Sequence, residues 1–111
     1  MIPPFISYIT FNRLGLTIRN LSALLNSAED FELHIIDSNS GDDTWEYIMS
    51  LDDSRIRARE RFEVNHGKIY ALNLHVLTRR PEQYFFSVDS GVRIETAGWI
   101  VKFLKVFKAF P

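Results

Sequence analysis

The chain has 111 residues, of which 46% are hydrophobic and 24% charged, and its formal net charge is −1. This length suits one domain, and the apolar fraction excludes a disordered chain. The near-neutral charge argues against a nucleic-acid partner, and the absence of cysteine excludes disulfides, thiol catalysis and Cys-ligated metal centres.

The N-terminal segment lacks the basic region and cleavage site of a signal peptide. No apolar run approaches the roughly 20 residues that a membrane span requires. With the lack of cysteine, these features lead us to expect a cytoplasmic protein.

The first strand and helix are predicted near the N-terminus. Residues 5–10 combine aromatic and β-branched side chains, which predicts a strand, and two prolines precede it. Apolar residues at helical spacing then predict a helix over residues 14–26. The residues of this repeat are Leu14, Ile18, Leu21, Leu24 and Leu25.

A second strand and helix follow in the same order. Residues 31–37 are predominantly apolar and predict a strand, and residues 38–43 are dense in turn formers. Asp43, with Glu46 three residues later, predicts the cap of a helix. The expected apolar face of this helix consists of Trp45, Ile48 and Met49.

The remaining elements continue the alternation. A charged strand is predicted over residues 55–61, a helix over 68–78, a strand over 84–89 and a short extended piece over 92–94. The expected apolar face of the third helix consists of Ile69, Leu72, Val76 and Leu77.

A last helix is predicted over residues 99–110, apolar except for a narrow stripe formed by Lys102, Lys105 and Lys108. Such a helix is normally buried, and a small domain cannot bury all of it against one sheet. We therefore expect self-association through Trp99–Phe110. A helix lying on a membrane surface is the competing interpretation, which we weight lower.

Strands that alternate with helices predict an α/β fold, with an open, mainly parallel sheet and helices on both faces. In such folds, ligands bind beyond the carboxyl ends of the strands. Asp37 and Asp89 each end an apolar strand, where a carboxylate is costly to bury unless it binds something. The residues that we expect to act only as caps and turn formers are Ser40, Gly41, Asp42 and Asp43.

Several α/β classes are disfavoured. Gly15 is the only glycine in the turn that directly follows the first strand, so the G-x-G-x-x-G turn of a dinucleotide-binding fold and the P-loop are both absent. A receiver domain would need an acidic pair after the first strand, which is also missing. The histidines show no metal-ligand spacing; we expect His34 and His75 to be structural or solvent-facing and only His66 to lie near the site.

Four segments resemble the motifs of glycosyltransferase family 2, in the nucleotide-sugar-binding half of the GT-A fold. Residues 9–13 are similar to its T-[YF]-N-R motif, and residues 35–44 to the V-D-[ND]-[GN]-S-x-D-[GD]-T segment. Residues 65–73 are similar to N-x-G-x-x-x-A-x-N, and residues 84–92 to the strand that ends in D-x-D. Together the four motifs cover nearly the whole chain.

The resemblance implies a donor site that binds a nucleotide-sugar, with a UDP-sugar as the family default. It implies that Asp37 accepts a hydrogen bond from the base, that Lys68 lies near the base, ribose or phosphate, and that Asp89 approaches a divalent Mg or Mn ion. The site residues that the motifs imply are Thr10, Phe11, Asn12, Arg13, Asp37, Asn39, Asn65, Gly67, Lys68, Asn73 and Asp89.

Two departures from the family pattern limit this expectation. Gly91 stands where the second acid of D-x-D would be, which argues against a complete metal site. Glu95 could replace that acid only if the loop folded back, and we expect it to be a surface residue instead. The chain also ends at Pro111, before any counterpart of the acceptor-binding half and its catalytic base.

We therefore expect one truncated domain, residues 1–111, which binds a nucleotide-diphospho-sugar for transfer to an unknown acceptor. No catalytic residue is identifiable, and this chain alone is expected to be inactive as a transferase. The alternative is a non-catalytic interaction module with a decayed site, which oligomerises through its apolar C-terminal helix.

Overall fold

A computed structural model describes residues 2–89 of the chain, except for the side chain of Asp89. It contains seven elements: β1 (Phe5–Thr10), α1 (Leu14–Asn26), β2 (Glu32–Asp37), α2 (Thr44–Ser50), β3 (Ile56–Arg61), α3 (Lys68–Thr78) and β4 (Phe85–Asp89). All seven were predicted from the sequence, and the second, third and fourth strands each begin one residue later than expected. The pieces expected at 92–94 and 99–110 lie outside the described residues.

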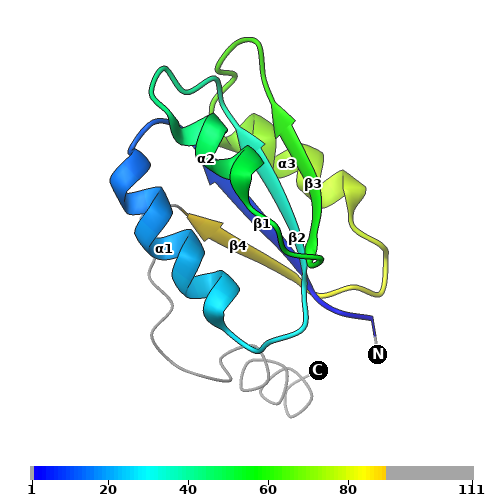
Figure 1. Cartoon of the computed structure of the whole chain (residues 1–111). Helices are drawn as coiled ribbons and strands as arrows, with labels where there is room; N and C mark the ends of the chain where they lie inside the picture. The colour runs from blue at the N-terminus through cyan, green and yellow to red at the C-terminus, as the bar shows by residue number, and fades with distance from the viewer. Residues whose placement is uncertain (1, 90–111) are drawn as a thin grey trace.

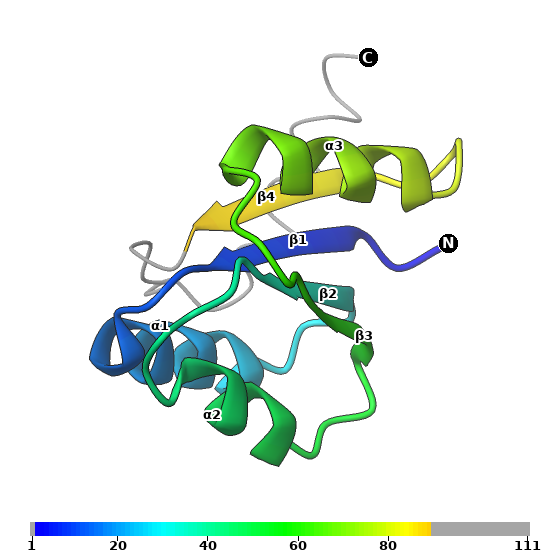
Figure 2. The same cartoon turned by 90° about the horizontal axis from the view of Figure 1, so that it is seen from above.

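The four strands form one parallel sheet in the order β3-β2-β1-β4. Helices α1 and α2 cover one face of the sheet, and α3 covers the other (Figures 1 and 2). The expected α/β architecture, with helices on both faces, is therefore confirmed. Because all strands run the same way, the loops that leave their carboxyl ends meet at one end of the sheet.

The larger part of the core lies between the sheet and the pair α1 and α2. Its buried members are Ile6, Tyr8, Leu21, Leu24, Phe31, Leu33, Ile35, Ile48 and Val88. On the other face, Ile9 and Ile36 pack with Phe62 and with Ala71 of α3. The central strands β1 and β2 are thus covered on both faces, which explains why they read as near-continuous apolar runs.

The buried face of α3 differs from the expected one. Ala71 and His75, one turn apart, are the buried residues of the helix, whereas Ile69 is 74% exposed and Leu77 82% exposed. Ala71 has a short side chain that suits close packing of the helix on the sheet, and Ser7 Oγ lies 2.5 Å from Nδ1 of His75. Because Ser7 on β1 offers a polar partner, His75 is buried on the face of α3 that packs on the sheet, which differs from the face that the apolar periodicity predicted.

Two further expectations about helix faces were wrong in detail. In α1, Thr17 and Asn20 are buried beside Leu21 and Leu24, while Ile18 is exposed. In α2, Met49 is 55% exposed rather than part of the core.

Two histidines, His34 of β2 and His75 of α3, meet between the sheet and α3. The ring of His34 stacks on Phe5 with 3.9 Å between centroids, and His75 meets the same phenylalanine edge-on at 5.4 Å. Burial lowers the pKa of both, and burial together with the neighbouring His34 lowers the pKa of His75 to about 4. Both histidines are therefore packing residues, which agrees with the structural role expected for them.

Candidate functional site

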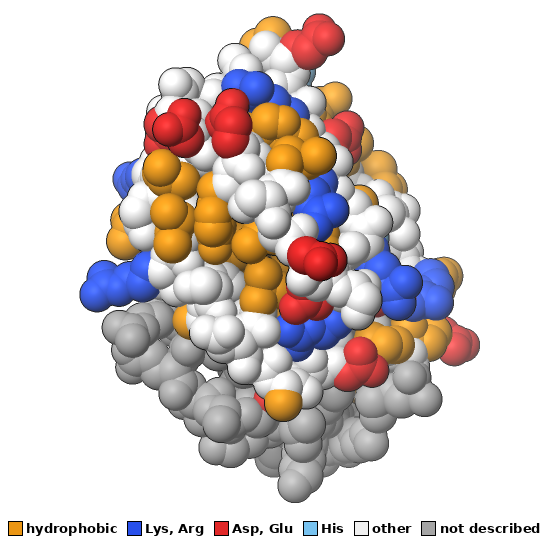
Figure 3. Space-filling view, in the orientation of Figure 1, with side chains coloured by type: hydrophobic (Ala, Val, Ile, Leu, Met, Phe, Trp, Pro, Cys, Tyr) orange, Lys and Arg blue, Asp and Glu red, His pale blue; other side chains and the backbone are white. Residues whose placement is uncertain are grey.

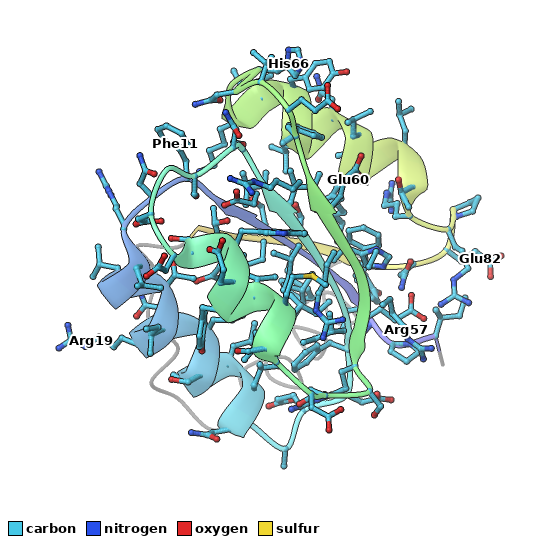
Figure 4. The ribbon with its side chains drawn as sticks, turned by 45° about the horizontal axis from the view of Figure 1, so that its top comes forward. Phe11, Arg19, Arg57, Glu60, His66 and Glu82 are labelled. Carbon is cyan, nitrogen blue, oxygen red and sulfur yellow. The ribbon has the colours of Figure 1, made fainter. Side chains whose placement is uncertain are left out.

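The loops at the carboxyl ends of β1, β2 and β3 form the walls of a pocket of about 290 Å³. Phe11 and His66, from two of these loops, lie at the same end of the molecule in Figure 4. The residues that line the pocket are Ile9, Phe11, Arg13, Ser38, Asn65, Gly67 and Lys68. Five of them, all except Ile9 and Ser38, are among the site residues that the sequence motifs implied.

Asp37 lies behind the pocket instead of lining it. Its side chain is fully buried. Oδ1 accepts hydrogen bonds from Thr10 Oγ1 at 2.8 Å and Ser40 Oγ at 2.5 Å, and Oδ2 accepts one from the Ser40 N–H at 2.8 Å. The Nε atom of Arg61 lies 3.7 Å from Oδ2. These donors offset the cost of burying the carboxylate. In this arrangement Asp37 and Thr10 hold the loops together, and the contact with a base that the resemblance implies for them stays a prediction.

The first two loops are held to each other by Asn12. Its N–H donates to Ser40 Oγ at 2.7 Å, and its Oδ1 accepts from the Gly41 N–H at 2.8 Å. Thr44 Oγ1 donates to the Asn12 carbonyl at 3.3 Å. Asn12 is therefore a connecting residue rather than a residue of the pocket wall.

Three residues of these loops have a left-handed backbone. The φ angles are 56° at Asn12, 58° at Arg13 and 70° at Asn39. Asparagine tolerates this region well, but arginine does so at a cost on the order of 1 kcal/mol. The backbone at Arg13 turns the chain from β1 into α1 and brings its side chain to the pocket.

Asp43 is the N-cap of α2, as expected, but its side chain makes no capping hydrogen bond, and the carboxylate of Asp42 supplies that bond instead. Asp42 Oδ1 accepts from the N–H and the hydroxyl of Thr44, at 3.0 and 2.5 Å. Its Oδ2 accepts from the N–H of Leu14 at 3.2 Å, so one carboxylate serves the starts of both α1 and α2. The hydrogen bond from Thr44 is the main cause of a lowered pKa at Asp42. As expected, Asp42 and Ser40 serve as cap and turn residues.

The third loop is built around a tight turn before α3. Asn65 Oδ1 accepts from the Gly67 N–H at 2.8 Å, and Gly67 has φ of 86°. A Cβ atom at Gly67 would meet nothing within 4 Å, so glycine is favoured here by backbone conformation and not by lack of space. His66 follows Asn65, and its ring lies tilted against that of Tyr70 with 4.6 Å between the centroids.

Two residues of this region were not among those expected. Ser38 is 2% exposed and lines the pocket, and its Oγ has no hydrogen-bond partner among the described residues. Arg61 donates from Nη2 to the Ser40 carbonyl at 2.8 Å. Ser38 directly follows Asp37 at the strand end, which is the signal that could have found it, whereas Arg61 is recognised only once β3 is paired with β2.

The other expected residues lie apart from the pocket wall. Asn39 is exposed in the second loop, and Asn73 is exposed on α3. Asp89 is the last residue of β4 and pairs in register with Ile9, which does line the pocket.

The described carboxylates do not fit a metal centre. Residues 2–88 contain no group of three or more histidine, aspartate or glutamate side chains that could hold an ion. Asp37 and Asp42 are already occupied by protein donors. A metal role for Asp89 therefore stays a prediction.

Comparison with known proteins identifies the family. The model of "Glycosyl transferase family 2" matches residues 6–108. Among curated protein sequences, none matches the chain significantly. Within the part of the chain that the structure describes, no helix is long and apolar enough to cross a membrane.

Solved structures of glycosyltransferases share the fold. TarS from S. aureus has a TM-score of 0.77 at 17% identity, over 96% of this chain and 20% of its own. TarS residues 1–349 in complex with UDP-GlcNAc score 0.77 at 18% identity, over 97% of this chain and 31% of that one. The mannosyltransferase PcManGT from Pyrobaculum calidifontis, in complex with GDP-Man and Mn²⁺, scores 0.78 at 17% identity, over 95% and 32%.

The chain thus spans less than a third of the length of each of these structures. Its parallel sheet, with helices on both faces, is that of the GT-A glycosyltransferases. With a family match that covers nearly its whole length, the chain belongs to glycosyl transferase family 2.

Proposed function

We propose that this domain binds a nucleotide-diphospho-sugar, with a UDP-sugar as the first candidate, and forms the donor-binding part of a sugar transferase. The observation that carries the proposal is the composition of the pocket. It combines an exposed aromatic ring, polar groups from two loops, and two cationic side chains at the carboxyl ends of parallel strands. The solved relatives were crystallised with UDP-GlcNAc, UDP and GDP-Man, which supports the same class of ligand.

Each pocket residue has a chemical role in this proposal. Phe11 is 46% exposed and offers a face against which a base can stack. Asn65 and Ser38 offer amide and hydroxyl groups to the edge of the base or the ribose. Arg13 and Lys68 lie where a negatively charged diphosphate would be attracted.

Other implied residues are not among those that line the pocket. Thr10, Asp37 and Asn12 hold the loops in place through the hydrogen bonds described above. Asn39 provides a left-handed turn in the second loop. Asp89 ends β4 next to the pocket residue Ile9 and is proposed to face the ribose or diphosphate.

The test is calorimetric titration of the chain with UDP, UDP-GlcNAc and GDP. Binding of at least one of these is expected, and Phe11→Ala should weaken it several-fold because the stacking surface is lost. Met49→Ala is the matched control, since Met49 is a similarly exposed apolar side chain on α2, outside the pocket. No heat of binding at millimolar nucleotide would contradict the proposal.

A second candidate is an interaction module without catalysis. The observation that favours it is the exposure of Ile69, Val76 and Leu77 on the outer side of α3. The face with α1 and α2 also carries hydrophobic side chains among charged ones (Figure 3). A monomeric mass in light scattering, with nucleotide binding intact, would favour the donor site over this candidate. The helix proposed for self-association, 99–110, lies outside the described residues.

A further inference from the structure

The loop between β3 and α3, residues 62–67, supplies part of the pocket wall. Asn65 and Gly67 line the pocket, and so does Lys68 at the start of α3. Gly67 has a φ of 86° and caps α3 without a side chain, and the hydrogen bond from its N–H to Asn65 Oδ1 is exposed to solvent. Glycine has the widest choice of backbone conformations, and an exposed hydrogen bond competes with water. These features alone do not fix the position of the wall residues.

Three aromatic rings connect the two ends of this loop. Phe62 directly follows β3, His66 lies in the loop, and Tyr70 lies in the first turn of α3. The ring centroids lie 4.6 Å apart for His66 and Tyr70, 5.8 Å for Phe62 and His66, and 5.7 Å for Phe62 and Tyr70. The two pairs that include Phe62 are edge-to-face, which is a favourable arrangement of aromatic rings. We call these three residues the ring cluster.

The ring cluster is anchored in the core at one side. Phe62 is 8% exposed and packs with Ile9 and Ile36, and its N–H donates to the last carbonyl of β2 at 2.9 Å. Tyr70, in contrast, is 48% exposed. The fixed point is therefore Phe62, and His66 and Tyr70 attach the loop and the start of α3 to it.

The ring cluster lies next to the pocket without lining it. His66 stands between two wall residues, Asn65 and Gly67, and Tyr70 follows Lys68 by two positions. None of the three rings is among the described residues that line the pocket. Figure 4 shows His66 in the loop that leads into α3, beside the start of that helix. Side chains in this position act on a ligand through the wall residues that they support.

We infer that the ring cluster has a positioning role: it holds the loop in the conformation in which residues 65–68 meet a ligand, without contacting the ligand itself. This inference rests on the proposed nucleotide function and deepens it. Tyr70 is the best residue for a test because its side chain is half exposed and contributes little to the core. Replacing it should therefore change ligand affinity while the fold stays intact.

The first measurement is the affinity of the chain for UDP by calorimetry. Tyr70→Ala removes two of the three ring contacts and should weaken UDP binding about fivefold, because one aromatic contact shifts an equilibrium by a factor of this order. Tyr70→Phe keeps the ring and should bind UDP within about twofold of the unchanged chain. The control is Leu77→Ala, which shortens an exposed apolar side chain two turns further along α3 and should also bind within about twofold.

The second measurement is ¹⁵N relaxation of the ligand-free chain, which a contact between Tyr70 and the ligand would not change. In Tyr70→Ala the order parameters of residues 63–67 should fall from about 0.85 to about 0.6, while those of α1 and α2 stay near about 0.85. In Tyr70→Phe and Leu77→Ala the loop should be as ordered as in the unchanged chain. Circular dichroism checks that each variant is folded.

The possible results separate the inference from the proposed function. A loss of affinity in Tyr70→Ala with an unchanged order of the loop overturns the positioning role, because the ring would then contact the ligand directly. Unchanged affinity in Tyr70→Ala, a loss that Tyr70→Phe does not restore, or an equal loss in Leu77→Ala overturns it as well. Each of these results leaves the nucleotide function standing, because the unchanged chain still binds UDP. If the unchanged chain binds neither UDP nor GDP, the proposed function fails and the inference fails with it.

Discussion

The two ends of the sheet use their charged side chains in opposite ways. At the amino ends of the strands, Arg55 donates to the carbonyls of Leu25, Ser27 and Glu29 at 2.6–2.7 Å and to Asp53 at 2.8 Å. Its guanidinium also lies 4.4 Å from the centre of the Phe31 ring. This one side chain joins the end of α1, the start of β2 and the start of β3.

A second network closes the same end. Gln83 Nε2 donates to the Pro3 carbonyl at 2.7 Å and to Glu32 at 2.8 Å, and Arg80 pairs with the same glutamate at 2.6 Å. The polar groups at this end are thus occupied by one another. These hydrogen bonds tie the chain together at this end.

At the carboxyl ends, polar side chains instead line a pocket. Arg13 and Lys68 line it, the backbone is left-handed at three loop positions, and the Ser38 hydroxyl lacks a partner among residues 2–88. At the amino ends of the strands the polar side chains stabilise the fold, whereas the carboxyl ends form the pocket at which ligand binding is proposed. Substitutions at the first end should therefore change unfolding, and substitutions at the second should change ligand affinity.

The largest effect is expected at Arg55. Arg55→Ala leaves three partly buried carbonyls without this donor and removes the side-chain hydrogen bonds to Asp53, and we expect it to lower the free energy of unfolding by about 3 kcal/mol. Urea unfolding measures this. Arg57→Ala, at an exposed position two residues later, should cost no more than about 0.5 kcal/mol. Equal losses in the two variants would contradict the role of the network.

A comparable effect is expected from pH, through His75. The pKa of His75 is about 4 in the folded chain, against 6.5 without burial, and the side chain is 5% exposed. Between these values the unfolded chain binds a proton that the folded chain does not. Stability should therefore fall as the pH falls from about 6.5 to 4, by at most about 3 kcal/mol, and this contribution should be fully present above pH 6.5.

The same pH range tests the assignment to His75. The lowered pKa of His34 acts in the same direction, so His75→Gln should reduce the pH dependence without abolishing it. His66→Gln, at an exposed loop position, should leave it unchanged. A pH dependence that is the same in all three proteins would show that His75 is not the group responsible.

A smaller loss is expected for Asp37→Asn. The substitution keeps the shape but replaces one acceptor with a donor and removes the charge beside Arg61, which should cost about 2 kcal/mol. UDP binding should weaken as well, because the Ser40 loop loses its anchor. Asp52→Asn, an exposed change in another loop, is the control. Unchanged stability in Asp37→Asn would show that the carboxylate is not needed to hold the loops.

The smallest change in stability is expected for Ser38→Ala, and it forms the sharpest contrast with Ser40→Ala. Both serines are buried, but within residues 2–88 only the hydroxyl of Ser40 makes hydrogen bonds, to Asp37 and Asn12. Ser40→Ala should cost about 1 kcal/mol or more, whereas Ser38→Ala should be neutral within about 0.5 kcal/mol. If Ser38 contacts the ligand, its removal should still weaken UDP binding several-fold. Equal costs in unfolding would contradict the difference between the two hydroxyls.

The order of the elements and much of the pocket follow from local sequence patterns. Because the strands alternate with helices, they are expected to run parallel to one another. The loops at their carboxyl ends then meet at one end of the sheet. Phe11, Arg13 and Lys68 were for this reason expected near one another, and they line one pocket. The family motifs and the strand ends point to the same segments.

Other features depend on contacts that no local pattern contains. The buried face of α3 follows Ala71 and His75 because Ser7, 68 residues before His75, supplies a polar partner. The role of Arg55 requires that the carbonyls of residues 25–29 lie beside β3. Asp42, and not the N-cap residue Asp43, supplies the side-chain hydrogen bond at the start of α2, and its carboxylate also reaches the start of α1.

The most direct test of the account is a two-dimensional ¹H–¹⁵N NMR titration of the chain with UDP. We predict that the amide signals of residues 10–13, 38–40 and 65–68 shift, while those of Arg55 and Gln83 at the opposite end of the sheet stay in place. Shifts that are absent at millimolar UDP, or that are as large around Arg55 and Gln83 as around the pocket, would contradict a nucleotide site at the carboxyl ends of the strands.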